Sequence, residues 1–182
     1  GHPEFFQEFC DSIVTFEGEE PLHRLLTTLK NGSTLRDVPN LIFCEDGKIV
    51  SNEERVELRF EEMPPPTFDG LPLDLYLSPY PILPVLQSRG CYWGKCTFCT
   101  HSFIYGHRYG KQRTEQMVDE LESLAKKYKT NYFTFSDEAV SPHSLNDVSE
   151  EIIKRDVDIK SLALLKFEKV MDQELFEKMK QA

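Results

Sequence analysis

Hydrophobic positions in the first fifty residues switch between the period of a strand and that of a helix. The run Ser12–Phe16 predicts a short strand, and four leucines at helical spacing follow it. Gly32 is typical of the residue that follows a helix end. Short apolar runs then flank Asp46-Gly47, a dipeptide that favours a tight β-hairpin. The pattern predicts a small α/β piece over residues 1–50.

Residues 51–84 differ from the preceding segment in composition. They contain seven of the eleven prolines of the chain and begin with a charged stretch. Proline removes backbone donors that a helix or sheet interior would use, so this segment is expected to be mostly extended. A linker with a domain boundary inside it is the predicted structure.

From Val85 onward, apolar runs and amphipathic stretches alternate along the chain. Alternating βα units imply a parallel sheet, whose chemistry lies at the carboxyl ends of its strands. The predicted fold class is therefore α/β. Strands are expected at Val85–Gln87, Tyr132–Phe135 and Ile159–Leu165. Helices are expected to follow them, capped by Thr114, Ser144 and Asp172.

The charge of the chain limits its expected partners. Lys and Arg number 21 against 31 Asp and Glu, which gives a net charge of -10. A surface of this charge repels polyanions, so nucleic acid is not an expected partner. No apolar run approaches the roughly 18 residues that suggest a membrane span, and no signal peptide is evident. We therefore expect a protein of the cytoplasm.

Three of the five cysteines are bunched directly after an expected strand. Cys91, Cys96 and Cys99 form a C-x4-C-x2-C motif. An odd cysteine count with such a bunch favours metal binding in a reducing compartment over a disulfide framework. Three thiolates at this spacing can hold one cubic 4Fe-4S cluster and leave one iron without a protein ligand. The alternative is a zinc site with His101 as a fourth ligand, in a structural or interaction module.

The sequence around these cysteines resembles the radical S-adenosylmethionine (SAM) superfamily. The resemblance is to the clade that joins a cobalamin-binding domain to the radical barrel, and it runs nearly the full chain. Besides the proline-rich link, it rests on Glu17-Gly18-Glu19, Ser88-Arg89-Gly90-Cys91, Thr97-Phe98-Cys99, Arg113 and Asp137-Glu138.

The resemblance implies a set of cofactor contacts and a reaction. The three cysteines would ligate the 4Fe-4S cluster, whose open iron would chelate SAM. Phe98 would lie near the adenine, and Ser136, Asp137 and Glu138 would contact the SAM amino group. The implied reaction is reductive cleavage of SAM to a 5'-deoxyadenosyl radical that acts on an unknown small-molecule or peptide substrate. The implied electron donor is a protein such as flavodoxin or ferredoxin, and no catalytic residue is assigned.

The resemblance also implies a domain organisation. Residues 1–50 would be the C-terminal part of a cobalamin-binding-like Rossmann domain, and residues 51–84 the proline-rich linker. Residues 85–182 would be the N-terminal part of a radical SAM (β/α) barrel. They hold only about three of the eight βα units of a full barrel, so the chain alone is expected to be weakly active or inactive.

Two departures from the family pattern bear on the cofactors. The first cysteine interval has one residue more than the usual C-x3-C-x2-C spacing, and Gly94 allows the backbone to accommodate it. No Asp-x-His-x-x-Gly motif is present. Cobalamin is therefore expected only in a full-length parent protein.

Overall fold

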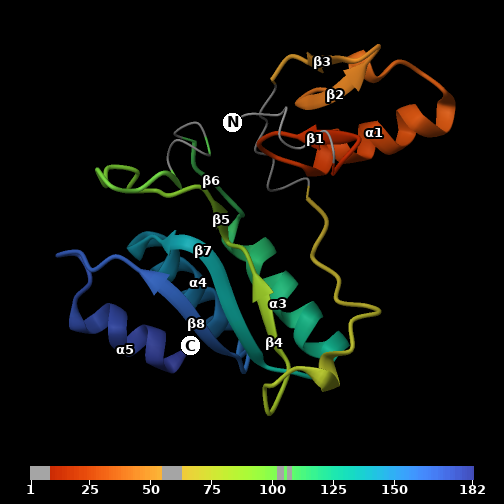
Figure 1. The fold of residues 1–182 in the computed structure, drawn as a ribbon. Helices are drawn as coiled ribbons and strands as arrows, with labels where there is room; N and C mark the ends of the chain where they lie inside the picture. The colour runs from red at the N-terminus through yellow and green to blue at the C-terminus, as the bar shows by residue number, and fades with distance from the viewer. Residues whose placement is uncertain (1–8, 55–62, 102–104, 106–107) are drawn as a thin grey trace. The chain divides into compact units, whose positions relative to one another are not determined.

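The computed structural model describes residues 9–54, 63–101, 105 and 108–182. The chain divides into two compact units, Gly1–Leu58 and Arg59–Ala182. Each unit has its own hydrophobic core. Figure 1 shows the elements of both units.

The first unit is a three-stranded sheet with one helix. Its core is formed by Val38, Leu41 and Phe43. The predicted hairpin is confirmed, since Asp46 and Gly47 join its strands with positive φ angles of 51° and 73°. The elements are β1 (Ser12–Val14), α1 (Glu19–Asn31), a 3-10 turn η2 (Leu35–Asp37), β2 (Leu41–Glu45) and β3 (Lys48–Ser51).

The described strands of this first unit pair only in the antiparallel sense. β2 lies between β1 and β3 and runs against both. A Rossmann-like domain has mostly parallel strands. The assignment of this unit to the end of such a domain therefore stays a prediction.

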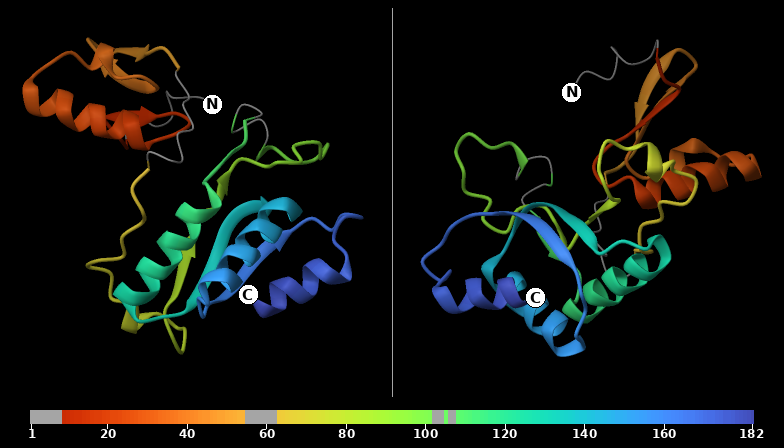
Figure 2. Two further views of the ribbon diagram at one scale, coloured as in Figure 1. Left: turned by 180° about the vertical axis from the view of Figure 1, so that it is seen from behind. Right: turned by 90° about the horizontal axis from the view of Figure 1, so that it is seen from below.

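The second unit is built on a parallel sheet of order β4-β7-β8. α3 and α4 lie side by side on one face of this sheet, as the two views of Figure 2 show. This arrangement confirms the predicted α/β class with a parallel sheet. The elements are η4 (Leu73–Leu75), β4 (Ile82–Val85), β5 (Ser88–Arg89), β6 (Gly110–Lys111), α3 (Thr114–Tyr128), β7 (Tyr132–Val140), α4 (Pro142–Arg155), β8 (Lys160–Leu165) and α5 (Gln173–Gln181).

Hydrophobic burial between the sheet and its helices forms the core of the second unit. Leu83 of β4 and Phe133 of β7 are 1% exposed, and Met117 and Leu121 of α3 are fully buried. The apolar stripe predicted for the helix at Thr114–Tyr128 therefore faces the sheet. Full burial of such side chains stabilises a fold by about 1.5–3 kcal/mol each.

Several predicted element ends differ from the structure. Thr114 lies inside α3, whose N-cap is Arg113, and Ser141 rather than Ser144 caps α4. Pro142 at the start of α4 explains the earlier beginning, because proline fits the first helical turn. The predicted strand Val85–Gln87 is replaced by β4, three residues earlier. Asp172 caps α5 as predicted, accepting a hydrogen bond from the Leu175 amide at 3.0 Å.

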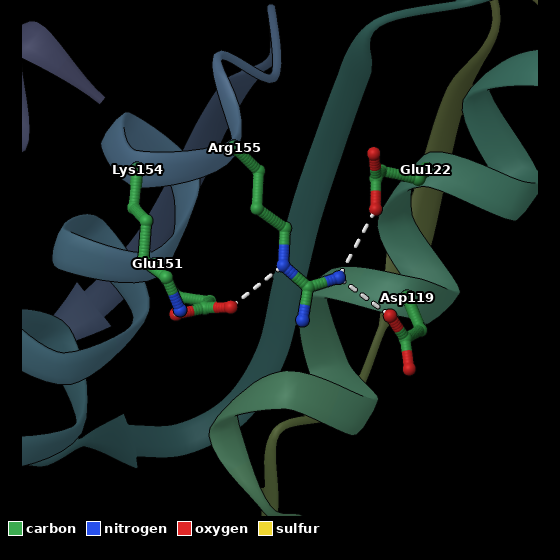
Figure 3. A network of polar contacts seen from close by, with 5 residues as sticks. All are labelled: Asp119, Glu122, Glu151, Lys154 and Arg155. Atoms are coloured by element: carbon green, nitrogen blue, oxygen red, sulfur yellow. Dashed lines mark hydrogen bonds and ion pairs between the residues drawn. The ribbon is translucent and has the colours of Figure 1, made fainter.

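Charged side chains connect α3 to α4 at the surface (Figure 3). Arg155 at the end of α4 contacts Asp119 at 2.5 Å and Glu122 at 3.2 Å, both on α3. It also contacts Glu151 of its own helix at 2.7 Å. One guanidinium thus bridges the two helices that cover the sheet.

Part of the proline-rich segment packs on the second unit. The Phe68 amide donates a hydrogen bond to the Tyr128 hydroxyl at 2.7 Å, and the two rings meet edge to face at 5.5 Å. Asp69 accepts from the same hydroxyl at 2.9 Å. This part of the expected linker is therefore anchored to the end of α3.

Across the described residues, no helix is long and apolar enough to cross a membrane.

Candidate functional site: the cysteine loop

The three clustered cysteines lie on the loop between β5 and β6, near the carboxyl end of β4. We call it the cysteine loop. Its base is closed by β5 and β6, which pair antiparallel with Ser88 opposite Lys111 and Arg89 opposite Gly110. The Gln112 amide adds a hydrogen bond to the Gln87 carbonyl at 2.9 Å. The two ends of the loop are therefore held together just after β4, near the carboxyl end of a parallel strand, where α/β folds place their chemistry.

Gly90 is required at the base of this loop. Its φ is +80°, a conformation that side chains rarely adopt. A Cβ at this position would lie 2.1 Å from the Arg108 carbonyl oxygen, which belongs to the returning arm of the loop. The residue directly before Cys91 must therefore be glycine for the two arms to approach.

The cysteine thiols are accessible, and two of them are joined by a turn. Cys91 and Cys99 are half-buried and Cys96 is exposed. The Cys99 amide donates to the Cys96 carbonyl at 3.2 Å. Within the described residues, no three His, Cys, Asp or Glu side chains are gathered as a ligand set for a metal ion. The structure thus places all three cysteines on one loop and shows no completed ligand set.

The predicted SAM-contacting residues lie inside β7 rather than after it. The predicted strand ended at Phe135, whereas β7 continues to Val140. The ladder to β8 is irregular here, because Phe135 pairs with Ala163 but Val140 already pairs with Leu165. Such an irregularity redirects side chains near a site. Ser136 is exposed, Glu138 is half-buried and Asp137 is 1% exposed.

Asp137 holds the start of the cysteine loop. Its carboxylate accepts hydrogen bonds from the Gln87 amide at 3.0 Å and from the Ser88 hydroxyl at 2.5 Å. Burial raises the pKa of Asp137 above its ordinary value, in spite of the opposing effect of these two hydrogen bonds. The carboxylate that sequence reasoning assigned to SAM is therefore engaged with the backbone on which the loop begins.

Glu138 lies beside His101, a residue of the cysteine loop. The His101 Nδ1 and Glu138 Oε1 atoms are 3.0 Å apart. The contact brings a proposed SAM contact and the alternative zinc ligand together. It joins the loop to β7 close to Cys99.

Phe98, the predicted adenine neighbour, is 88% exposed. An apolar ring this exposed adds little to the packing of the chain itself. Core packing, the other explanation for a phenylalanine at this position, does not apply.

Sequence reasoning gave no role to two residues that contact the cysteine loop from the segment after β8. The Tyr92 hydroxyl donates to Glu168 at 2.6 Å, and the Lys166 ammonium lies 3.6 Å from the centre of the Trp93 ring. No local pattern in the sequence could have paired residues 76 positions apart. Only the parallel sheet, which sets the end of β8 near the loop, could have suggested these contacts.

The second unit is thus an α/β fold with a parallel sheet and a three-cysteine motif near the carboxyl ends of its strands. No family model matches the chain. It is 30% identical over 164 residues to an uncharacterized methyltransferase of Pyrococcus horikoshii, a match that covers 86% of this chain and 36% of the relative. It is 26% identical over 173 residues to the anaerobic magnesium-protoporphyrin IX monomethyl ester cyclase of Rubrivivax gelatinosus, covering 87% and 30%. The chain thus spans about a third of the length of these curated relatives.

Solved structures share this fold. The cobalamin-dependent SAM radical enzyme OxsB matches with a TM-score of 0.69 and 22% identity, over 98% of this chain and 26% of that chain. The radical SAM methyltransferase TsrM of Kitasatospora setae, with tryptophan and a SAM analogue bound, matches with a TM-score of 0.68 and 20% identity, over 97% and 36%. The chain therefore shares its fold with two solved radical SAM enzymes, as the resemblance implied.

Proposed function

We propose that this chain is part of a radical SAM enzyme and that Cys91, Cys96 and Cys99 ligate a 4Fe-4S cluster. The observation that carries the proposal is the three-thiol loop at the carboxyl edge of a parallel sheet whose fold matches OxsB and TsrM. Sequence similarity to two enzymes supports it further. The whole reaction, with its substrate and its electron donor, belongs to the proposal.

The residues of the loop fit such a cluster. Three thiols that are not buried are the donors that iron–sulfur clusters use, and a backbone hydrogen bond from Cys99 to Cys96 closes the turn between the last two. The close approach at Gly90 and the hydrogen bonds to Asp137 anchor the side of Cys91. When bound and reduced, the cluster would supply the electron that cleaves the sulfonium of SAM into methionine and a 5'-deoxyadenosyl radical.

Glu138 and Ser136 are the proposed contacts for the SAM amino group. Both are accessible from solvent, and an acidic group facing an ammonium forms a charge-assisted hydrogen bond. Asp137 serves the same site differently, by fixing the strand end that leads into the loop. Phe98, projecting from the loop, is the proposed apolar neighbour of the adenine.

The domain organisation that the resemblance implies is part of the same proposal. The second unit would be the N-terminal part of a (β/α) barrel, with β4, β7 and β8 as its strands. The first unit would be the end of a cobalamin-binding-like domain. OxsB is described as cobalamin-dependent, and cobalamin binding would require parts of a longer parent protein. We expect the present chain to be a weak catalyst, because three strands enclose only part of a reaction chamber.

The rival function is a zinc-stapled module that uses the three cysteines and His101. A structural zinc site takes four nitrogen or sulfur ligands. The contact of His101 Nδ1 with Glu138 at 3.0 Å leaves Nε2 as the nitrogen that would bind zinc in this rival. The relatives favour the radical enzyme instead.

SAM binding tests the proposed function. The chain, reconstituted anaerobically with iron and sulfide, is titrated with SAM by calorimetry, and 5'-deoxyadenosine is measured by chromatography after dithionite reduction. We expect binding that weakens in Glu138→Gln and persists in Glu115→Gln, an exposed control on α3. Slow release of 5'-deoxyadenosine is expected from the chain and faster release from a longer parent protein. Absence of SAM binding in both proteins would contradict the proposal.

A further inference from the structure

Four side chains connect the cysteine loop to the segment after β8. Tyr92 and Trp93 belong to the loop, and Lys166 and Glu168 belong to the segment that follows β8. We call these four residues the clamp. Because Tyr92 and Trp93 lie between Cys91 and Cys96, the clamp contacts the interval that is one residue longer than the family spacing.

Three contacts build the clamp. The Tyr92 hydroxyl donates to Glu168 Oε1 at 2.6 Å. The Lys166 ammonium lies over the Trp93 ring at 3.6 Å from its centre, within the range of a cation–π interaction. Lys166 and Glu168 also pair with each other at 3.4 Å. A hydrogen bond, a cation–π contact and an ion pair therefore share the same four side chains.

The surroundings of the clamp favour its persistence. The Lys166 and Glu168 side chains are 34% and 24% exposed. The Tyr92 ring also meets the Tyr109 ring edge to face at 6.3 Å, so the loop's returning arm supports it from another side.

The rest of the Cys91–Cys96 interval is Gly94 and Lys95. Lys95 is exposed, and Gly94 has a φ of +59°, a conformation that glycine adopts readily. A flexible interval of extra length would let the first thiol move relative to the other two. Pre-organised ligands bind more tightly than mobile ones, because less conformational entropy is lost when the ligand set closes.

We propose that Lys166 and Glu168 are positioning residues for the cluster: through Trp93 and Tyr92 they fix the lengthened Cys91–Cys96 interval. The segment after β8 thereby sets the geometry of the loop that follows β4. This inference rests on the proposed cluster function. Lys166 and Glu168 would act through the loop side chains that they contact, not as ligands of the cluster.

Trp93 makes the clamp directly observable, because it is the single tryptophan of the chain. Its emission and its quenching by acrylamide report on the loop in the full chain without metal. We expect Tyr92→Phe and Lys166→Met to make Trp93 more accessible, with the opening equilibrium of the loop shifted by a factor of about 3–10, as for loss of one hydrogen bond. Lys166→Arg keeps a cation above the ring and should restore the wild-type quenching.

Lys95→Met is the matched control. Lys95 also lies over the Trp93 ring, at 5.1 Å, but it belongs to the loop itself and does not bridge to another strand. Its removal should leave quenching close to the wild-type value. Far-UV circular dichroism identifies any variant that fails to fold, and Tyr92→Phe, which removes one oxygen, provides the conservative test.

Iron retention links the clamp to the cluster. After anaerobic reconstitution, we expect Tyr92→Phe and Lys166→Met to lose iron to a chelator about 3–10-fold faster than wild type and Lys95→Met. Unchanged quenching and unchanged iron loss in both variants would overturn the inference. Increased quenching, with no iron bound by any protein including wild type, would overturn the proposed cluster function and leave the clamp itself intact.

Discussion

The helix-packed sheet and the cysteine loop of the second unit are stabilised in different ways. In the sheet, Leu83, Phe133 and Met117 are at most 1% exposed and share one continuous core. In the loop, residues 95–98 are all exposed, and its conformation depends on single contacts made by Gly90, Asp137 and the clamp. Loop geometry can therefore be lost without unfolding the sheet, whereas loss of the core would disrupt both.

The largest expected effect is on the core side of this comparison. Phe133→Ala should lower the free energy of unfolding of the second unit by about 3–5 kcal/mol, because it removes a fully buried ring and leaves a cavity. Phe167→Ala is the control, since Phe167 is 78% exposed. Urea denaturation followed by circular dichroism measures both. Equal losses in the two variants would contradict the assignment of the core.

Gly90→Ala should damage the loop more than the sheet. The added Cβ would lie 2.1 Å from the Arg108 carbonyl oxygen, so the two arms of the loop would have to separate. The φ of +80° adds backbone strain. We expect bound iron to fall strongly and stability by about 1–3 kcal/mol, the usual cost of backbone strain. Gly70→Ala has nearly the same φ, +82°, in open space, so it isolates strain from the clash. If both variants bind iron equally, the close approach at Gly90 has no role in the site.

Buried Glu120 makes the stability of the second unit depend on pH. The residue is 7% exposed, contacts Gln112 Nε2 at 3.3 Å, and burial raises its pKa. The folded state then binds the proton more tightly than the unfolded state. The stability that protonated Glu120 contributes is complete below the ordinary carboxyl pKa. It is lost as pH rises through the pKa that Glu120 has in the folded state.

Glu120→Gln should remove this dependence, because an amide has no proton to lose. Wild type should therefore lose stability relative to the variant as pH rises above about 4.5, the ordinary value. Urea midpoints at a series of pH values measure the difference. Glu115→Gln, at an exposed position of the same helix, should track wild type. A difference that grows in favour of wild type with pH would show the opposite sign and exclude a raised pKa.

The smallest expected effect concerns the bridge between α3 and α4. Arg155→Met should destabilise the second unit far less than Phe133→Ala, because exposed ion pairs contribute little and salt screens them. Thermal unfolding at low and high salt measures the effect, which should shrink at high salt. Lys154→Met removes a neighbouring charge that does not reach α3 and serves as the control. A salt-independent loss would point to packing rather than charge.

Sequence periodicity predicted the scaffold well. The stripe of α3 and the Asp46-Gly47 hairpin follow from local patterns, and both are confirmed. Alternating βα units correctly implied the parallel sheet, since a parallel connection needs a crossover. The ends of elements were less accurate, as Ser144 and Thr114 show, because several neighbouring residues can cap a helix.

The site was only partly accessible to sequence reasoning. The motif placed Cys91, Cys96 and Cys99 on one loop, as the structure has them, while their role as ligands stays a prediction. The burial of Asp137 could not be foreseen, because it depends on the tertiary contact between β7 and Ser88, which donates a hydrogen bond to the Asp137 carboxylate. The contacts of Lys166 and Glu168 depend on tertiary structure alone.

Cluster ligation by Cys91, Cys96 and Cys99 is tested by iron and sulfide content together with the ultraviolet-visible spectrum after anaerobic reconstitution. We expect a brown protein with about four irons and four sulfides per chain and broad visible absorbance, as for a 4Fe-4S cluster. Replacement of Cys91, Cys96 and Cys99 by alanine should abolish these, whereas Cys44→Ala in the first unit should not. A colourless protein that holds stoichiometric zinc, or iron binding that survives the triple replacement, would contradict cluster ligation by these cysteines.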